Sequence, residues 1–137
     1  MLAHGHHVVA VAALVIQGDR VLAMRRAATK LPGPGLWETI SGRVEHGEEP
    51  LAAVIREIAE ESGLHVEVEP RPFAAYASTR GADPMIVIAF RARHLTGEVT
   101  ISDEHDAHAW CTASEFGERS TLAPLVAVVE RALRDPW

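Results

Sequence analysis

The chain has 137 residues and a net charge of −6, with 47% hydrophobic and 23% charged residues, a composition that favours one soluble globular domain over residues 1–137. The acidic balance disfavours a nucleic-acid partner, which requires a basic stripe, and the single cysteine, Cys111, excludes an intrachain disulfide. The apolar run 8–16 is too short to cross a bilayer and lacks signal-peptide features, so we expect a cytoplasmic protein without a membrane partner.

Two buried strands are predicted near the N-terminus. Residues 8–17 are apolar without alternation, which indicates a strand covered on both faces. A Gly-Asp turn signal follows, and residues 20–26 return as a second strand that ends in Arg25 and Arg26. These two arginines are either solvated strand-end charges or ligands for substrate phosphates, to which the planar guanidinium is well suited.

A loop and a short strand come next. The PGPG run at 32–35 interrupts regular structure, so residues 27–35 are expected as a loop. Residues 36–40 are predicted as a short strand that carries Trp37 and Glu38. A buried core position is the plainest interpretation of Trp37.

The segment 42–64 predicts a short loop followed by one helix. Pro50 suits the first helical position, where its missing N–H costs nothing, and Gly63 suits the left-handed position that ends a helix. A helix between them directs a mostly apolar stripe toward the core, made of Leu51, Val54, Ile55, Ile58 and Ser62.

Three carboxylates, Glu57, Glu60 and Glu61, fall on the side of this helix opposite the stripe. They form either a solvated acidic face or a site for a divalent cation. Like charges three and four residues apart destabilise a helix, and here they lie toward its C-terminal end, against the helix dipole. This cost is understandable if a hard cation such as Mg²⁺ binds the carboxylates.

The fixed residues of this segment match the Nudix box in every specified position: Gly42, Glu48, Arg56-Glu57-Ile58, Glu60-Glu61 and Gly63-Leu64. The chain therefore resembles the Nudix hydrolase family. The resemblance implies an α/β protein, a Nudix-type α/β/α sandwich with a mixed β-sheet. It also implies a hydrolase that uses Mg²⁺, or alternatively Mn²⁺, on a small-molecule nucleotide.

The same resemblance implies roles for individual residues. Glu57, Glu60 and Glu61 are expected to bind metal and to act in catalysis. Ser41 stands where a glycine commonly precedes the box, and it keeps the backbone carbonyl that is expected to bind metal. Arg56 is expected to brace the box loop through Glu48 and to orient the catalytic carboxylates, with an ordinary surface ion pair as the alternative.

Strands are also predicted in the second half of the chain. They cover residues 65–68, 73–78 and 85–95, with a loop at 79–84. Pro70 and Pro72 indicate a kinked or edge strand between the first two. The order of strands and helix favours a mixed sheet.

A second acidic stretch, residues 102–109, precedes Trp110 and is expected as a loop. By the resemblance, a loop at this place holds a further acid that binds metal or acts as a base, and Glu104 is the first choice. The alternatives are Asp103, His105 and Asp106, or a solvated loop with no catalytic part. His105 and His108 are expected at the surface, because no third soft ligand is spaced with them for zinc.

Two helices complete the predicted fold. Thr112 and Glu115 form a capping box that starts a short helix. Ser120 or Thr121 is expected to cap the last helix, whose core-facing stripe is Leu122, Leu125, Val126, Val129 and Leu133.

The resulting hypothesis is hydrolysis of a pyrophosphate bond in a nucleoside diphosphate linked to another moiety, such as a nucleoside triphosphate or ADP-ribose. A bound divalent cation would neutralise the diphosphate and activate a water, and Glu57 or Glu104 would accept the proton. The candidates for substrate binding are Arg25, Arg26, Lys30, Trp37, Glu38, Tyr76 and Arg80.

Two alternatives belong to other functional classes. The first is a non-catalytic Nudix ligand-binding or regulatory module, against which the complete box argues. The second is an isoprenyl diphosphate isomerase, against which the position of Cys111, far from the box in sequence, argues. Association into a homodimer is left open.

Overall fold

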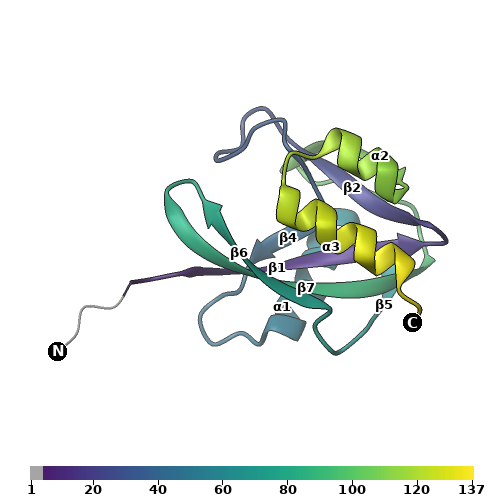
Figure 1. Cartoon of the computed structure of the whole chain (residues 1–137), viewed down its shortest axis with the longest axis horizontal. Helices are drawn as coiled ribbons and strands as arrows, with labels where there is room; N and C mark the ends of the chain where they lie inside the picture. The colour runs from purple at the N-terminus through teal and green to yellow at the C-terminus, as the bar shows by residue number, and fades with distance from the viewer. Residues whose placement is uncertain (1–4) are drawn as a thin grey trace.

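The longest strands, β1 (Val8–Gln17) and β7 (Asp83–Thr96), lie side by side in parallel at the centre of one mixed sheet. A computed structural model describes residues 5–137 of the chain, so residues 1–4 of the predicted domain lie outside the described residues (Figure 1). The other strands are β2 (Arg20–Arg26), β3 (Trp37–Glu38), β4 (Ile40–Arg43), β5 (His65–Val68), β6 (Ala74–Arg80) and β8 (His105–Cys111). The helices are α1 (Pro50–Ser62), α2 (Ala113–Arg119) and α3 (Ala123–Arg134).

All other strand pairs are antiparallel. Strand β1 pairs with β4 along residues 10–13 and with β2 at residues 16–17, so these two strands share one edge of β1. Strand β2 also pairs with β3 and β8, and β7 pairs with β5 and β6. The predicted mixed sheet is confirmed, and it brings β3, β4 and the start of β8 to the same region.

The sheet is covered on both faces, as the absence of alternation in β1 predicts. Figure 1 shows α2 and α3 together over one face. The residues packed there include Leu14, Ile16, Phe116, Leu125 and Val129. Helix α1 covers the opposite face, in a cluster that includes Val11, Val15, Val54, Ile58 and Phe90. This arrangement confirms the predicted α/β/α sandwich.

The ends of α1 are those that its sequence predicts. Pro50 is its first residue, and Gly63 adopts the left-handed conformation (φ 69°) and donates its N–H to Ala59 O at 3.1 Å. The predicted faces are only partly correct. Ile55 is 50% exposed, whereas Glu57 and Glu61 are buried against the sheet. Glu57 and Glu61 therefore lie within the covered face of the helix and not opposite it, whereas Glu60 is exposed.

Three boundaries differ from the sequence-based expectation. The loop expected at 79–84 is a two-residue hairpin turn, because Gly81 adopts a left-handed φ of 59° and Arg80 already pairs with Asp83. The strand expected at 36–40 is broken at Thr39 into β3 and β4. Strand β8 begins at His105, so the expected acidic loop is shorter.

The two C-terminal helices start differently. The capping box of Thr112 and Glu115 is present at α2, as predicted. The prediction for α3 is wrong, because Leu122 occupies its N-cap without a side-chain bond. Ser120 instead accepts from the N–H of Leu122 at 3.2 Å and donates to Trp37 O at 2.8 Å, which anchors the turn before α3 to β3. Within residues 5–137, no helix has the length and apolar character that crossing a membrane requires.

Candidate functional site

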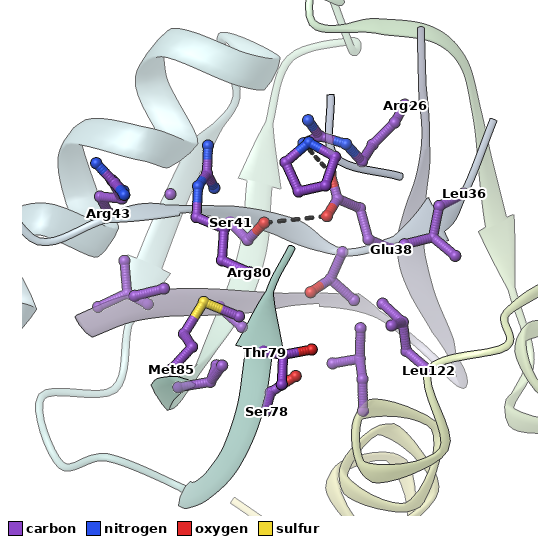
Figure 2. Close-up of a pocket in the computed structure, with 18 of the residues that line it drawn as sticks. Arg26, Leu36, Glu38, Ser41, Arg43, Ser78, Thr79, Arg80, Met85 and Leu122 are labelled. Carbon is purple, nitrogen blue, oxygen red and sulfur yellow. Dashed lines mark hydrogen bonds and ion pairs between the residues drawn. The ribbon is translucent and has the colours of Figure 1, made fainter. Parts of the chain in front are cut away.

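A pocket of about 500 Å³ opens beside the Nudix box segment (Figure 2). Its polar wall includes Glu57 of α1, Gly42 of β4 and Glu104 of the loop before β8. Its apolar wall includes Met85 and Val87 of β7, Leu122 at the N-cap of α3, and Pro124 and Leu125 in the first turn of α3. The pocket therefore joins a carboxylate-rich end to an apolar end.

Gly42 allows α1 to approach β4 closely. A Cβ atom on Gly42 would lie 2.1 Å from Cδ of Glu57, which is well inside van der Waals contact. Only glycine leaves this space for the Glu57 carboxylate. Gly42, the first residue of the box, is therefore needed for steric reasons, because any side chain there would overlap the Glu57 carboxylate.

Arg56 connects the loop to the helix, as the resemblance implies. Its Nε and Nη2 donate to the two oxygens of Glu48 at 2.9 and 3.0 Å, and Nη2 also donates to Arg43 O at 3.1 Å. The Arg56 hydrogen bonds, together with the N–H of Glu45, lower the pKa of Glu48 to about 2. The predicted pairing of Arg56 with Glu48 is confirmed.

The same guanidinium also orients two of the box carboxylates. Arg56 Nη1 donates to Glu57 Oε1 at 2.7 Å and to Glu60 Oε2 at 3.2 Å. Burial raises the pKa of Glu57, and Arg56 opposes that rise. Glu60 is the most exposed of the three, with a side chain 59% accessible.

Glu61 is almost completely buried, at 2% exposure. Its Oε2 accepts from the N–H of Ser41 at 3.1 Å. Burial raises the pKa of Glu61 to about 10, with further contributions from a hydrogen bond to the Glu104 carboxyl and from the charge of Glu57. The structure thus brings Glu104 to the box carboxylates.

These residues fit the divalent cation that the resemblance implies. Carboxylate and carbonyl oxygens are the ligands that Mg²⁺ and Mn²⁺ prefer, and the mutual repulsion of Glu57, Glu61 and Glu104 leaves a need for positive charge. Among residues 5–137, no three acidic, histidine or cysteine side chains are already gathered as a metal cluster. Arg56 donates a hydrogen bond to Glu57, and the N–H of Ser41 donates one to Glu61.

Glu38 lies in the pocket wall and receives contacts from three sides. Ser41 Oγ donates to its Oε1 at 3.2 Å, and Arg26 Nη1 lies 3.6 Å from its Oε2, as Figure 2 shows by dashed lines. His105 Nε2 lies 2.9 Å from the same Oε2. The expectation that His105 is a surface residue is wrong, because its side chain has 0% exposure. Alternation along β8 could have revealed this, since Asp106 and His108 are exposed.

The structure divides the candidate substrate-binding residues. Those that line the pocket are Arg26, Lys30, Glu38, Tyr76 and Arg80. Burial and the charge of Glu38 raise the pKa of Tyr76 to about 12, so its hydroxyl stays available as a donor.

Arg25 and Trp37 are not among the lining residues. Arg25 Nε donates to Asp106 Oδ1 at 2.6 Å, and Trp37 packs against the core with Arg119 at 5.3 Å from its ring centre. Since successive strand residues point to opposite faces, only one of the paired arginines faces the pocket. The binding roles of Arg25 and Trp37 stay predictions.

Several lining residues carry no signal in the sequence. The sequence predicts Leu122 and Leu125 only as part of the core stripe of the last helix, yet they form part of the apolar wall together with Pro124. Met85 and Val87 likewise belong to an apolar strand that reads as core. Their place in the pocket depends on how the β6–β7 hairpin and α3 meet, which is not a local property.

The first prediction concerns the close approach at Gly42. Gly42→Ala should lower the turnover number by about a hundredfold, because the added methyl group displaces the Glu57 carboxylate from its position. The backbone at Gly42 does not require a left-handed φ, so the thermal midpoint should change by only a few degrees. Steady-state kinetics and a melting curve measure both. Gly47→Ala, at an open surface position with φ 78°, serves as the control, and it should strain the backbone without the loss of turnover.

The second prediction follows from the raised pKa of Glu61. Between its ordinary value of 4.5 and about 10, the unfolded chain holds this carboxyl ionised while the folded protein holds it protonated. The folded state then binds more protons, so the free energy of unfolding contributed by this group falls as pH rises through that window.

Glu61→Gln removes this penalty and keeps an amide that can donate to Glu104. Without divalent cations, the variant should melt about 4 °C or more above the wild type at pH 8, since about 1 kcal/mol moves the midpoint of such a domain by that amount. The difference should disappear near pH 4.5. A variant that melts below the wild type at pH 8 would contradict the assignment.

Comparison with known proteins places this geometry in context. The family model for the NUDIX domain matches residues 6–133. A "MutT-like protein" from Streptomyces ambofaciens is 37% identical over 114 residues, which cover 82% of this chain and 69% of the relative. A "CTP pyrophosphohydrolase" from Escherichia coli K12 is 29% identical over 107 residues, which cover 77% of this chain and 76% of the relative.

The fold agrees with a solved structure as well. The crystal structure of a MutT protein from Methanosarcina mazei Go1 superposes with a TM-score of 0.84 over 95% of each chain, at 22% sequence identity. The family match covers nearly the whole chain, and Gly42 and Glu57 of the box line the pocket. The protein therefore belongs to the NUDIX family and is a Nudix hydrolase.

Proposed function

We propose that this protein hydrolyses a pyrophosphate bond in a nucleoside diphosphate linked to another moiety, with nucleoside triphosphates as the substrate class. We further propose that residues 1–137 act as one domain. The observation that carries the function is a pocket lined by Glu57 of α1 and by Glu104 of the loop before β8, with an apolar wall beside them. Neighbouring carboxylates repel the phosphates of a nucleotide. They therefore suit a reaction on a nucleotide only when a cation binds together with the substrate.

Hydrolases of this family generally need a divalent metal, and we propose Mg²⁺, with Mn²⁺ as the alternative. The proposed ligands are the Ser41 carbonyl, Glu57, Glu60, Glu61 and Glu104. When bound, the cation would neutralise the diphosphate and lower the pKa of a water beside it.

The chain's own residues supply binding and proton transfer. Arg26, Lys30 and Arg80 line the pocket and can pair with phosphate oxygens. Glu57 and Glu104 both line the pocket, and either can accept the proton of an attacking water. Arg56 fixes Glu57 through its Nη1, so its function is to orient a carboxylate rather than to touch substrate.

The choice of triphosphates rests on two observations. The apolar wall of Met85, Val87 and Leu122 offers a place for a base, and the same pocket is lined by cationic side chains that can pair with a triphosphate. The Escherichia coli relative is named for the hydrolysis of CTP. Hydrolysis of ADP-ribose is the alternative that the nucleotide panel below distinguishes.

The third prediction tests the metal-binding carboxylates. Glu60→Gln and Glu61→Gln should each reduce turnover to less than a tenth of the wild type, because each removes a charged oxygen ligand. Both variants should keep the circular dichroism spectrum of the wild type. Glu118→Gln, at an exposed position on α2, is the matched control and should keep full activity. More than a tenth of the activity in either box variant would refute the metal assignment.

The substrate class is tested by a panel of nucleotides. Nucleoside triphosphates, ADP-ribose and dinucleoside polyphosphates are incubated with Mg²⁺, with Mn²⁺ or with chelator, and phosphate is measured with and without added pyrophosphatase and phosphatase. We expect metal-dependent release of pyrophosphate from triphosphates. Preference for ADP-ribose would overturn the substrate class but keep the reaction type, and no release from any compound would overturn both.

A further inference from the structure

We propose that His105 is a positioning residue that holds Glu104 against the box carboxylates by anchoring the start of β8 to Glu38. This inference rests on the proposed role of Glu104 in hydrolysis. His105 lies next to Glu104 in the chain but belongs to the core, whereas Glu104 is exposed in the pocket wall. His105 is thus the buried anchor, and Glu104 is the carboxylate that this anchor positions.

The anchor is a single oriented contact. The His105 side chain has 0% exposure, and its Nε2 lies 2.9 Å from Glu38 Oε2. Its other nitrogen, Nδ1, is buried without a hydrogen-bond partner among the described residues. An aliphatic side chain would fill this space without leaving a polar atom unsatisfied. The histidine is therefore explained by the contact with Glu38 rather than by packing.

The contact continues to the box helix. Glu38 Oε1 accepts from Ser41 Oγ at 3.2 Å, and the N–H of Ser41 donates to Glu61 Oε2 at 3.1 Å. His105, Glu38, Ser41 and Glu61 thus form an unbroken series of contacts from β8 through β3 and β4 to α1. Glu61 lies at one end of this series. Glu104 is the chain neighbour of His105, which lies at the other end, so the series positions both carboxyls.

The start of β8 needs an anchor because Glu104 is repelled at its place. Glu57 and Glu104 both line the pocket, and the charge of Glu104 adds to the rise in the pKa of Glu57, so these two carboxylates repel each other. The loop itself is held by few backbone bonds, among which Ala27 N–H donates to Glu104 O at 2.9 Å. The register of β8 against β2 shifts between Arg25 and Arg26, which is where His105 begins the strand. Because the loop that carries Glu104 has few backbone bonds, it can move away from the box carboxylates unless His105 holds the start of β8 in place.

Four variants test the inference. His105→Leu fills the space without a donor, and His105→Gln can place an amide nitrogen near the position of Nε2. His105→Asn places its amide closer to the backbone, out of reach of Glu38, and serves in place of the leucine variant if that protein does not fold. His108→Gln, on the exposed side of the same strand, is the control.

For the leucine and asparagine variants we expect the turnover number to fall about tenfold or more with KM changed less than threefold, since a displaced general base or ligand affects the reacting geometry. The glutamine variant should restore most of the turnover. A residue that only packs the core would show the opposite order, with leucine tolerated and glutamine damaging.

A binding measurement without substrate gives an independent readout. Calorimetric titration with Mn²⁺ alone should show an affinity about threefold or more weaker in His105→Leu and in Glu104→Gln. The double variant should bind no more weakly than Glu104→Gln, because residues that act through one another are not additive. Effects that multiply in the double variant would overturn the inference.

The two proposals fail in distinguishable ways. If the wild type hydrolyses no nucleotide but the Mn²⁺ pattern holds, the proposed function fails and the positioning role of His105 stands. If the wild type is active and His105→Leu or His105→Asn matches it in both turnover and Mn²⁺ affinity, His105 has no such role. Absence of Mn²⁺ binding by the wild type would overturn both.

Discussion

Repulsion between carboxylates is the physical constraint on which the site depends. Glu57 and Glu61 lie on the covered face of α1, and Glu104 meets them from the loop that leads into β8. Each additional negative charge in this buried region is unfavourable. The surrounding structure opposes that effect at defined points: Arg56 bonds Glu57, the N–H of Ser41 bonds Glu61, and the space at Gly42 admits a carboxylate where a side chain would exclude it.

The local features of this arrangement could be predicted from sequence, because they depend on residues near one another. Pro50 and Gly63 give the ends of α1 directly, and the pairing of Arg56 with Glu48 follows from the box. The orientation of the helix was less accessible. A periodicity argument assigns the apolar side to the core, yet Ile55 is half exposed while Glu61 is buried, because β4 and not solvent faces the carboxylates. Apolar spacing alone cannot show which polar residues a sheet will cover.

Contacts between distant segments account for what the sequence did not reveal. Glu38 and His105 are 67 positions apart, and their pairing depends on β3 and β8 both joining β2. The apolar wall has the same origin, since it combines β7 with the start of α3. Neither has a periodic signature. The apolar end of the pocket is therefore a product of sheet order, which the box does not encode, whereas the box supplies Gly42 and Glu57 at the carboxylate-rich end.

The burial of Glu61 links the stability of the protein to the charge at its site. An ionised Glu61 is unfavourable, because it is buried and lies near the charges of Glu57 and Glu104. The same burial strengthens the attraction of the Glu61 carboxylate to a cation, because a low dielectric constant strengthens attraction and repulsion between charges alike. A solvated acidic face would have neither property. The structure thus places Glu57 and Glu61 on the covered side of the helix, where burial raises their pKa values and would also strengthen their attraction to a divalent cation.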